Sequence, residues 1–490
     1  TRKTLLIAHR TRTSSVKVFT DNIAAAWERG KYIRVKPYEY KQKEVTDEKR
    51  VETPLCLTKK NSYDETSTVS ITSYKSLSVK ELRLKNGLSI LLRPTDDGTE
   101  MVHLSSFAGG ETADLLPHDM YRYEEAAGYM EMGGIASVPY DSLMVYMAQN
   151  NIAMNIGIGL HWHELLATAP TDKAVELFNL VYEKLHHPEL RYEDFEEARN
   201  EALDDFGKET LLDKMIKQSP ERLLNNKLDS LMGNVVSFPR LRTRDDLKIL
   251  NLDSIADYYR RVFTDPSRMT VLLTGAFDAD SILPSLVATF ARMKRPSDAY
   301  QTVDIPFEPI KQFYSESFKG KKQEATSMEY LLVGNYFPSL RSSLLLKLIR
   351  DILQNRMLTV LREQENIVYS PYVSLYYHGV PQQKYYYQLS ATIDNENMEL
   401  VKNLVRDIVV RLQQEIVPKE ELENLKRSFL VTKRHVLNEK ATTDWKNTIV
   451  NLLKNGESLK DFDAYEQCLS TITPESIREA CRQYLGIVFR

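Results

Sequence analysis

The feature that most constrains this chain of 490 residues is an internal repeat. Leu177, Phe178 and Val181 lie 227 residues before Leu404, Val405 and Ile408. Near the ends of the copies the offset becomes 222, where Asp253-Ser254-Ile255 matches Glu475-Ser476-Ile477. Several elements share nearly one offset in the same order, which favours two homologous copies over a chance alignment of two α/β stretches.

The pattern within each copy predicts strands followed by long helices. Residues 80–94 alternate around Asn86-Gly87, which is typical of a two-residue β-hairpin turn. A strand at 101–107, helices at about 172–187, 192–208, 217–231 and 252–263 and a strand at 269–274 follow. The second copy repeats this order with a strand at 328–333, a helix at 340–361, strands at 367–378 and 384–393 and further helices. The residues alone therefore predict a two-domain α/β protein.

Charge and composition exclude several classes of protein. The 65 basic residues against 68 acidic ones leave a net charge of -3, which argues against a nucleic-acid binder. No stretch approaches the roughly 20 apolar residues of a membrane span. Cys56, Cys468 and Cys481 are too few and too scattered for a disulfide scaffold or a CxxC metal site, so they do not settle the compartment.

Two histidine pairs are candidate metal ligands. On a strand, His161 and His163 would face one side and Trp162 and Glu164 the other, and two imidazoles on one face could bind zinc. A third ligand is not evident, and we favour a pair that packs in the sheet. Pro188 interrupts His186-His187-Pro188-Glu189, which favours a loop between two helices. The sequence contains no H-E-x-x-H, phosphate loop or G-x-S-x-G motif.

Several phrases together resemble the C-terminal half of zinc peptidases of the pitrilysin and insulin-degrading-enzyme family, most closely the bacterial members with both halves on one chain. These phrases are KNGLSILLRPT, DYYRRVF followed by VLLTGAFD, LREQENIVYSP and ITPESI. The resemblance implies two homologous α/β (α+β) domains, each a mainly antiparallel sheet covered by helices. It assigns 1–20 to the last strand of the preceding N-terminal half, 21–77 to a linker between the halves, 78–300 to an inactive peptidase-like domain and 301–490 to a C-terminal one. It also implies a fragment of a longer protein.

The resemblance further implies that this chain lacks the zinc site. Family peptidases carry H-x-x-E-H on a helix, whereas the matching place here reads Gly128-Tyr129-Met130-Glu131-Met132. Glycine cannot ligate, and a methionine thioether is a poor substitute for imidazole on Zn²⁺. Asp204 or Asp205 falls where the third ligand would be. We therefore expect no zinc in this chain and place the zinc in the missing N-terminal half.

Arg362 and Tyr369 match an arginine and a tyrosine that the family's C-terminal half directs at the substrate. The resemblance thus implies a non-catalytic half of a zinc endopeptidase, which forms a chamber wall and binds a peptide or unfolded substrate beside its own N-terminal half. We expect a periplasmic or cell-envelope protein. Two alternatives stay open: a non-peptidase scaffold built on inactive peptidase-like domains, and a self-sufficient metalloenzyme that uses His161, His163 and Glu164.

Overall fold

The computed structural model describes residues 52–96, 98–109, 126–158, 162–206, 219–233, 243–298, 317–318, 325–368, 370–379, 383–437 and 442–486. The chain divides into Thr1–Arg50 and Val51–Arg490, and all described residues belong to the second unit. The predicted strand at 1–20 and the first part of the predicted linker lie outside these ranges.

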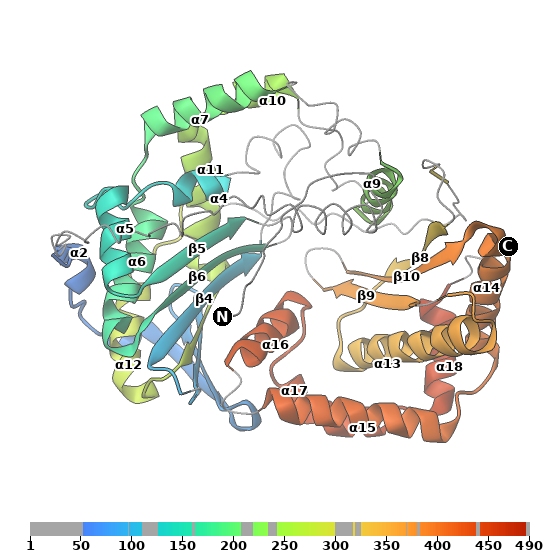
Figure 1. Ribbon diagram of the computed structural model, residues 1–490. Coiled ribbons are helices and arrows are strands. Elements are labelled where there is room, and N and C mark those ends of the chain that lie inside the picture. The colour runs from blue at the N-terminus through green and yellow to red at the C-terminus, as the bar shows by residue number, and fades with distance from the viewer. Residues whose placement is uncertain are drawn as a thin grey trace, which may run out of the picture. The chain divides into compact units, whose positions relative to one another are not determined.

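A seven-stranded sheet forms the first structural layer, in the order β1-β2-β3-β7-β4-β6-β5 (Figure 1). All neighbouring strands are antiparallel except β3 and β7, which pair in parallel. The strands are β1 (Thr68–Tyr74), β2 (Val79–Leu84), β3 (Ser89–Pro94), β4 (Met101–Gly109), β5 (Ala153–Ile158), β6 (Trp162–Pro170) and β7 (Met269–Gly275).

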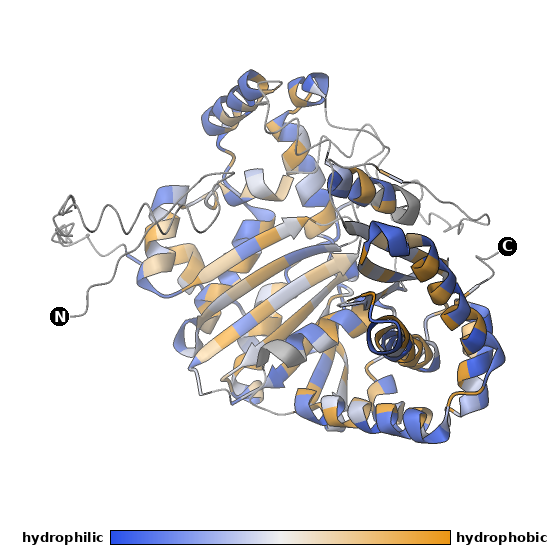
Figure 2. Cartoon of the chain, turned by 45° about the vertical axis from the view of Figure 1, so that its right-hand side comes forward, coloured by the Kyte–Doolittle hydropathy of each residue, from blue (hydrophilic) through white to orange (hydrophobic). Residues whose placement is uncertain are grey.

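Helices cover one face of this sheet, because its strands present apolar side chains to them (Figure 2). Leu177 of α6 and Leu286 of α12 are fully buried together with Ile90 and Leu165 of the sheet. The described helices and 3-10 turns between residues 52 and 298 are α2 (Leu55–Thr58), η1 (Glu65–Ser67), η2 (Lys75–Leu77), α4 (Ala126–Glu131), α5 (Tyr140–Gln149), η4 (Thr171–Lys173), α6 (Ala174–His186), α7 (Tyr192–Asp205), α9 (Pro220–Gly233), α10 (Arg244–Lys248), α11 (Leu252–Phe263), η5 (Pro266–Arg268) and α12 (Ala279–Phe290).

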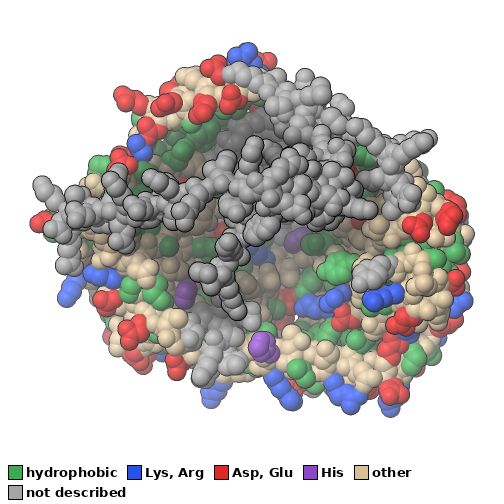
Figure 3. Space-filling view, viewed as in Figure 1, with side chains coloured by type: hydrophobic (Ala, Val, Ile, Leu, Met, Phe, Trp, Pro, Cys, Tyr) green, Lys and Arg blue, Asp and Glu red, His purple; other side chains and the backbone are tan. Residues whose placement is uncertain are grey.

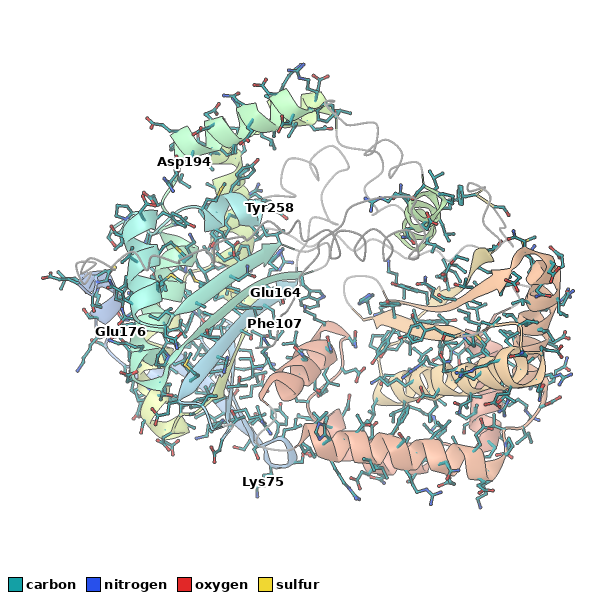
Figure 4. The ribbon with its side chains drawn as sticks, viewed as in Figure 1. Lys75, Phe107, Glu164, Glu176, Asp194 and Tyr258 are labelled. Carbon is teal, nitrogen blue, oxygen red and sulfur yellow. The ribbon has the colours of Figure 1, made fainter. Side chains whose placement is uncertain are left out.

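The opposite face of the seven-stranded sheet contacts helices from the end of the chain. Phe107 of β4 and Leu272 of β7 form a separate core with Ile449 of α16 and Phe462 of α17. Phe107 lies opposite Glu164 in the β4–β6 register, and Figure 4 labels both residues on these neighbouring strands. Lys454 of α16 forms an ion pair with Glu164 at 3.6 Å. Helices α16 and α17, near the end of the chain, therefore cover part of the second face of the seven-stranded sheet.

A second sheet of three antiparallel strands has the order β8-β10-β9. Its strands are β8 (Ala325–Asn335), β9 (Tyr372–His378) and β10 (Lys384–Asp394). The accompanying helices are α13 (Leu340–Met357), the π-helix η6 (Leu358–Gln364), the 3-10 turn η7 (Asn395–Asn397), α14 (Met398–Gln414), α15 (Lys419–Val436), α16 (Thr442–Lys454), α17 (Asp461–Ser470) and α18 (Pro474–Tyr484). Ile349, Val405, Leu389 and Ile477 join these elements in one core.

The predicted mixed fold, with helices packed on mainly antiparallel sheets, is confirmed. The folded unit starts earlier than residue 78, however. Residues 68–77, which we assigned to the linker, contain β1 and η2, and they are fixed because Tyr74 and Leu77 are buried against Phe462 and its neighbours. Among the described helices, none combines the length and hydropathy needed to cross a membrane.

Candidate substrate-binding site

Arg362 lies near the end of η6, the π-helix that continues α13. The side chain of Arg362 is exposed, whereas that of its neighbour Leu361 is fully buried in the core of the second sheet. Wider π-turns are rare and often occur at functional sites. The buried leucine thus fixes the backbone from which the guanidinium projects.

The chain then reverses in what we call the η6 turn, Leu361–Val368. The backbone N–H groups of Ile367 and Val368 both donate to the carbonyl of Leu361, at 3.0 and 3.2 Å. Asn366 adopts a left-handed backbone with φ of 52°, a conformation that asparagine tolerates better than most residues. Val368 is only 4% exposed. Both ends of the turn are therefore anchored in the core.

Gln354 of α13 holds the strand that follows. Its amide nitrogen donates to the carbonyl of Pro371 at 2.9 Å, and its amide oxygen accepts from the N–H of Val373 at 2.8 Å. Tyr369 itself lies outside the described residues, between Val368 and Ser370. The described residues on either side of it are held by the carbonyl of Leu361 and the side chain of Gln354.

The residues that the resemblance aligns with the zinc motif lie on and directly after α4, where Gly128 and Met132 are exposed and Glu131 is half-buried. The carboxylate of Glu131 accepts a hydrogen bond from the backbone N–H of Ile156. Ile156 belongs to β5, the last strand of the sheet. Glu131 therefore connects α4 to that edge, and these three residues do not fit a zinc ion, since neither neighbour offers a strong ligand.

Behind α4 lies the α4–α6 cluster, which consists of Glu131, Gly133, Gly134, Lys184 and Glu189. The ammonium of Lys184 donates to the carbonyls of Gly133 and, at 3.3 Å, Gly134. Glu189 accepts from the N–H groups of Gly134 at 2.7 Å and Tyr140 at 2.9 Å. A Cβ on Gly134 would lie 2.3 Å from the carbonyl oxygen of Val138, so this close approach requires glycine.

Burial dominates the electrostatics of Lys184. The side chain is 2% exposed, and its burial lowers the pKa to about 8, although the nearby carboxylates of Glu131 and Glu189 act in the opposite direction. The charged groups of this cluster thus contact backbone atoms and lie near one another. Their role is to hold the backbone that follows α4.

The histidine candidates lie in different surroundings. His163 points from β6 into the core, where its ring packs against Phe263 with centroids 5.3 Å apart, and burial lowers its pKa to about 3. His161 lies outside the described residues. His186 stacks on Tyr182, and His187 contacts Glu183 at 2.7 Å in the expected loop between α6 and α7. Within the described ranges, no three His, Cys, Asp or Glu side chains are grouped so that they could hold a metal ion.

Asp204 and Asp205 are exposed at the end of α7. They line an open surface together with Glu197, Asn200 and Glu201. Acidic side chains gather along this helix in Figure 3. A solvated acidic helix face explains these residues without a bound cation.

Sequence reasoning missed Lys184 and Glu189, which hold the backbone beside the motif. The available signal was Gly133-Gly134, since adjacent glycines often mark a close backbone approach. A lysine within an amphipathic helix gives no such signal, because most are solvated.

Residues 250–429 match the model of the peptidase M16 inactive domain. The periplasmic protease PqqL from Escherichia coli has a similar structure, with a TM-score of 0.75 and 16% identity over 88% of this chain and 46% of that one. The ferredoxin protease FusC, solved as a mutant in complex with Arabidopsis ferredoxin, gives a TM-score of 0.63 and 14% identity over 95% of this chain and 49% of that one. These findings confirm the resemblance to the C-terminal half of a pitrilysin-family protein.

The first half of PqqL also has this fold, with a TM-score of 0.63 and 13% identity over 87% of this chain and 91% of that one. The chain spans about half the length of the two full proteases, at 46% and 49%. Among curated proteins, none matches the chain. The fold of this chain is thus also that of the first half of such a protease.

Proposed function

We propose that this chain is the non-catalytic C-terminal half of a zinc metalloendopeptidase. In this role it forms part of the wall of a chamber and binds the substrate through Arg362 and Tyr369. The observation that carries the proposal is the η6 turn, which exposes Arg362 while Leu361 and Val368 are buried on either side. A rigid backbone beneath an exposed guanidinium suits a group that must reach a substrate.

The chemistry follows from the two donors. A guanidinium and a phenol can donate hydrogen bonds to the carbonyl of a peptide and to the negative charge that develops on it during hydrolysis. The zinc ion of the N-terminal half would supply the activated water. Glu131 would take no part, since its carboxylate accepts the N–H of Ile156.

The proposed partner is the N-terminal half, and the proposed substrate is a peptide or an unfolded protein. The match of 46% of PqqL supports the first, and the ferredoxin bound to FusC supports a protein substrate. A periplasmic or cell-envelope location is proposed because PqqL is a periplasmic protease.

The test is peptide hydrolysis by the full-length protein. Arg362→Ala and Tyr369→Phe should each lower kcat/KM about 100-fold, the effect of removing one donor from a developing oxyanion. Arg434→Ala on α15 is the matched control, since Arg434 is also an exposed arginine. Glu131→Gln should leave hydrolysis intact. Unchanged kcat/KM in both Arg362→Ala and Tyr369→Phe would overturn the assigned role.

A further inference from the structure

The last turn of α13 is tied to a second helix directly before η6 begins. Arg356 is the second-last residue of α13. Its guanidinium donates to both carboxylate oxygens of Glu421 on α15, at 3.0 and 2.6 Å. Because the guanidinium is planar, such a two-point contact fixes the direction of the side chain as well as its distance from the carboxylate.

Glu421 is itself held in place. It lies in the first turn of α15, where the helix dipole favours an acidic side chain. Its neighbour Leu422 is fully buried in the core of the second sheet. The side chains of Arg356 and Glu421 are 32% and 19% exposed, so water and salt screen their attraction less than that of a fully exposed pair. The pair therefore joins α13 to a fixed point on α15.

Gln354 holds the opposite side of the same turn of α13. Two residues that lie two positions apart on an α-helix point about 200° apart around its axis. The amide of Gln354 contacts Pro371 and Val373, directly before and within β9, whereas Arg356 contacts α15. Contacts on opposite sides of a helix resist its rotation about its own axis.

The angle of α13 about its axis affects the direction in which Arg362 points. The π-helix η6 follows α13 without a break and carries Arg362 near its end. A rotation of the last turn of α13 would therefore be passed on to Arg362. Leu361 restrains the far end of η6 by packing in the core. Gln354 and Arg356 restrain the near end.

We propose that Arg356 and Glu421 are positioning residues that act through Arg362. The inference rests on the proposed function, since it requires that Arg362 contacts the substrate. Together with Gln354, the ion pair holds the start of η6, so that the guanidinium of Arg362 keeps one direction relative to a peptide carbonyl. Hydrolysis depends on this direction, because a misplacement of about 1 Å can slow a reaction about 100-fold.

The test is a double-mutant cycle on peptide hydrolysis by the full-length protein. Arg356→Met should lower kcat/KM about tenfold, with most of the loss in kcat, because Arg362 acts on the developing charge. In an Arg362→Ala background the same change should lower kcat/KM less than about twofold, since no guanidinium remains to be positioned. Glu421→Gln, which removes the charge and keeps the size of the side chain, should show the same dependence on the background.

Arg350→Met is the matched control. Arg350 is also an arginine of α13 and is 39% exposed, but its ion pair is with the adjacent Asp351 on the same helix. This ion pair does not tie α13 to another element, so Arg350→Met should hydrolyse the peptide like the wild type. Equal losses of kcat/KM in Arg350→Met and Arg356→Met would contradict the inference.

The outcomes separate this inference from the proposed function. If Arg362→Ala alone leaves kcat/KM unchanged, the proposed role of Arg362 fails and the inference fails with it. If Arg362→Ala lowers kcat/KM but Arg356→Met and Glu421→Gln do not, only the inference is overturned. The same holds if their losses are equal in both backgrounds, which is the result that a merely structural role would give. Urea denaturation of each variant checks that it is folded in the assay.

Discussion

The α4–α6 cluster and the η6 turn differ in whether their charged side chains are buried or exposed. In the cluster, Lys184 and Glu189 contact backbone groups of the segment beside α4, and the Lys184 ammonium is buried. In the η6 turn the buried residues are apolar, and Arg362 is exposed. The comparison shows a charge that holds the fold enclosed among backbone groups and another that is exposed beside an apolar anchor.

The α4–α6 cluster shows how charged side chains hold the backbone beside α4. Glu131, which the resemblance aligns with the glutamate of the motif, accepts from Ile156 at the edge of the sheet. Variants of the cluster should therefore change stability, whereas variants of the η6 turn should also change hydrolysis by the full-length protein.

The largest expected effect comes from Gly134→Ala. The new Cβ would lie 2.3 Å from the carbonyl oxygen of Val138 and 2.6 Å from the N–H nitrogen of Tyr140, so backbone must move. We expect a loss of about 3 kcal/mol in the free energy of unfolding, measured by equilibrium urea denaturation. Gly128→Ala is the matched control, because no atom lies within 4 Å of its Cβ, and it should stabilise α4 by up to about 1 kcal/mol. Equal losses in both variants would contradict the close approach at Gly134.

The second effect is a pH dependence at Lys184. Burial holds its folded pKa at about 8, below the ordinary value of 10.5, so the unfolded chain binds more protons between these values. Stability should therefore rise with pH across this window, by about 2–3 kcal/mol from this group. Lys184→Met should remove that rise in urea denaturation at a series of pH values. Lys248→Met, at a side chain 58% exposed, should retain it, and a rise that persists in Lys184→Met would assign it to another group.

The smallest effect tests the η6 turn. Gln354→Ala removes both amide contacts to Pro371 and Val373, which should cost about 1–2 kcal/mol in the free energy of unfolding. In the full-length protein it should also lower kcat/KM about tenfold, since Pro371 and Val373, which follow the η6 turn, lose their contacts to α13. Gln414→Ala, at an exposed end of α14, should change neither. If Gln354→Ala alters stability alone, the turn behaves like the cluster and the contrast fails.

The sequence predicted the elements with strong local signals. The helix expected at 252–263 is α11, whose Asn251 side chain caps its first turn. The hairpin expected at residues 80–94 joins β2 to β3, but its loop has three residues and not two, since the N–H of Leu84 donates to the carbonyl of Leu88. Gly87 takes the positive φ, 93°, that the last residue of such a loop requires. The repeat likewise anticipated the strands β8 and β10 of the second sheet.

Features set by distant residues were not predictable in this way. β1 was assigned to the linker because both faces of residues 70–73 are exposed, which removes the alternation that identifies a half-buried strand. The contacts of Lys184 reach across about fifty residues to Gly133 and Gly134, and no local pattern encodes them. The strand expected from 367 begins only at Tyr372, and Ile367 and Val368 belong to the η6 turn instead. The role of Arg362 and Tyr369 rests on the family resemblance and stays a prediction.

The π-helical winding of η6 determines the direction in which the Arg362 side chain leaves the helix. A π-turn accommodates more residues than an α-turn, so each residue after Met357 advances by a smaller angle around the axis. An α-helix turns by about 100° per residue. Deleting one residue between Leu358 and Val360 would therefore rotate the guanidinium about a quarter of the way round the helix, with the Arg362 and Tyr369 side chains both still present. The direction of the Arg362 side chain is thus set by helical pitch as well as by residue identity.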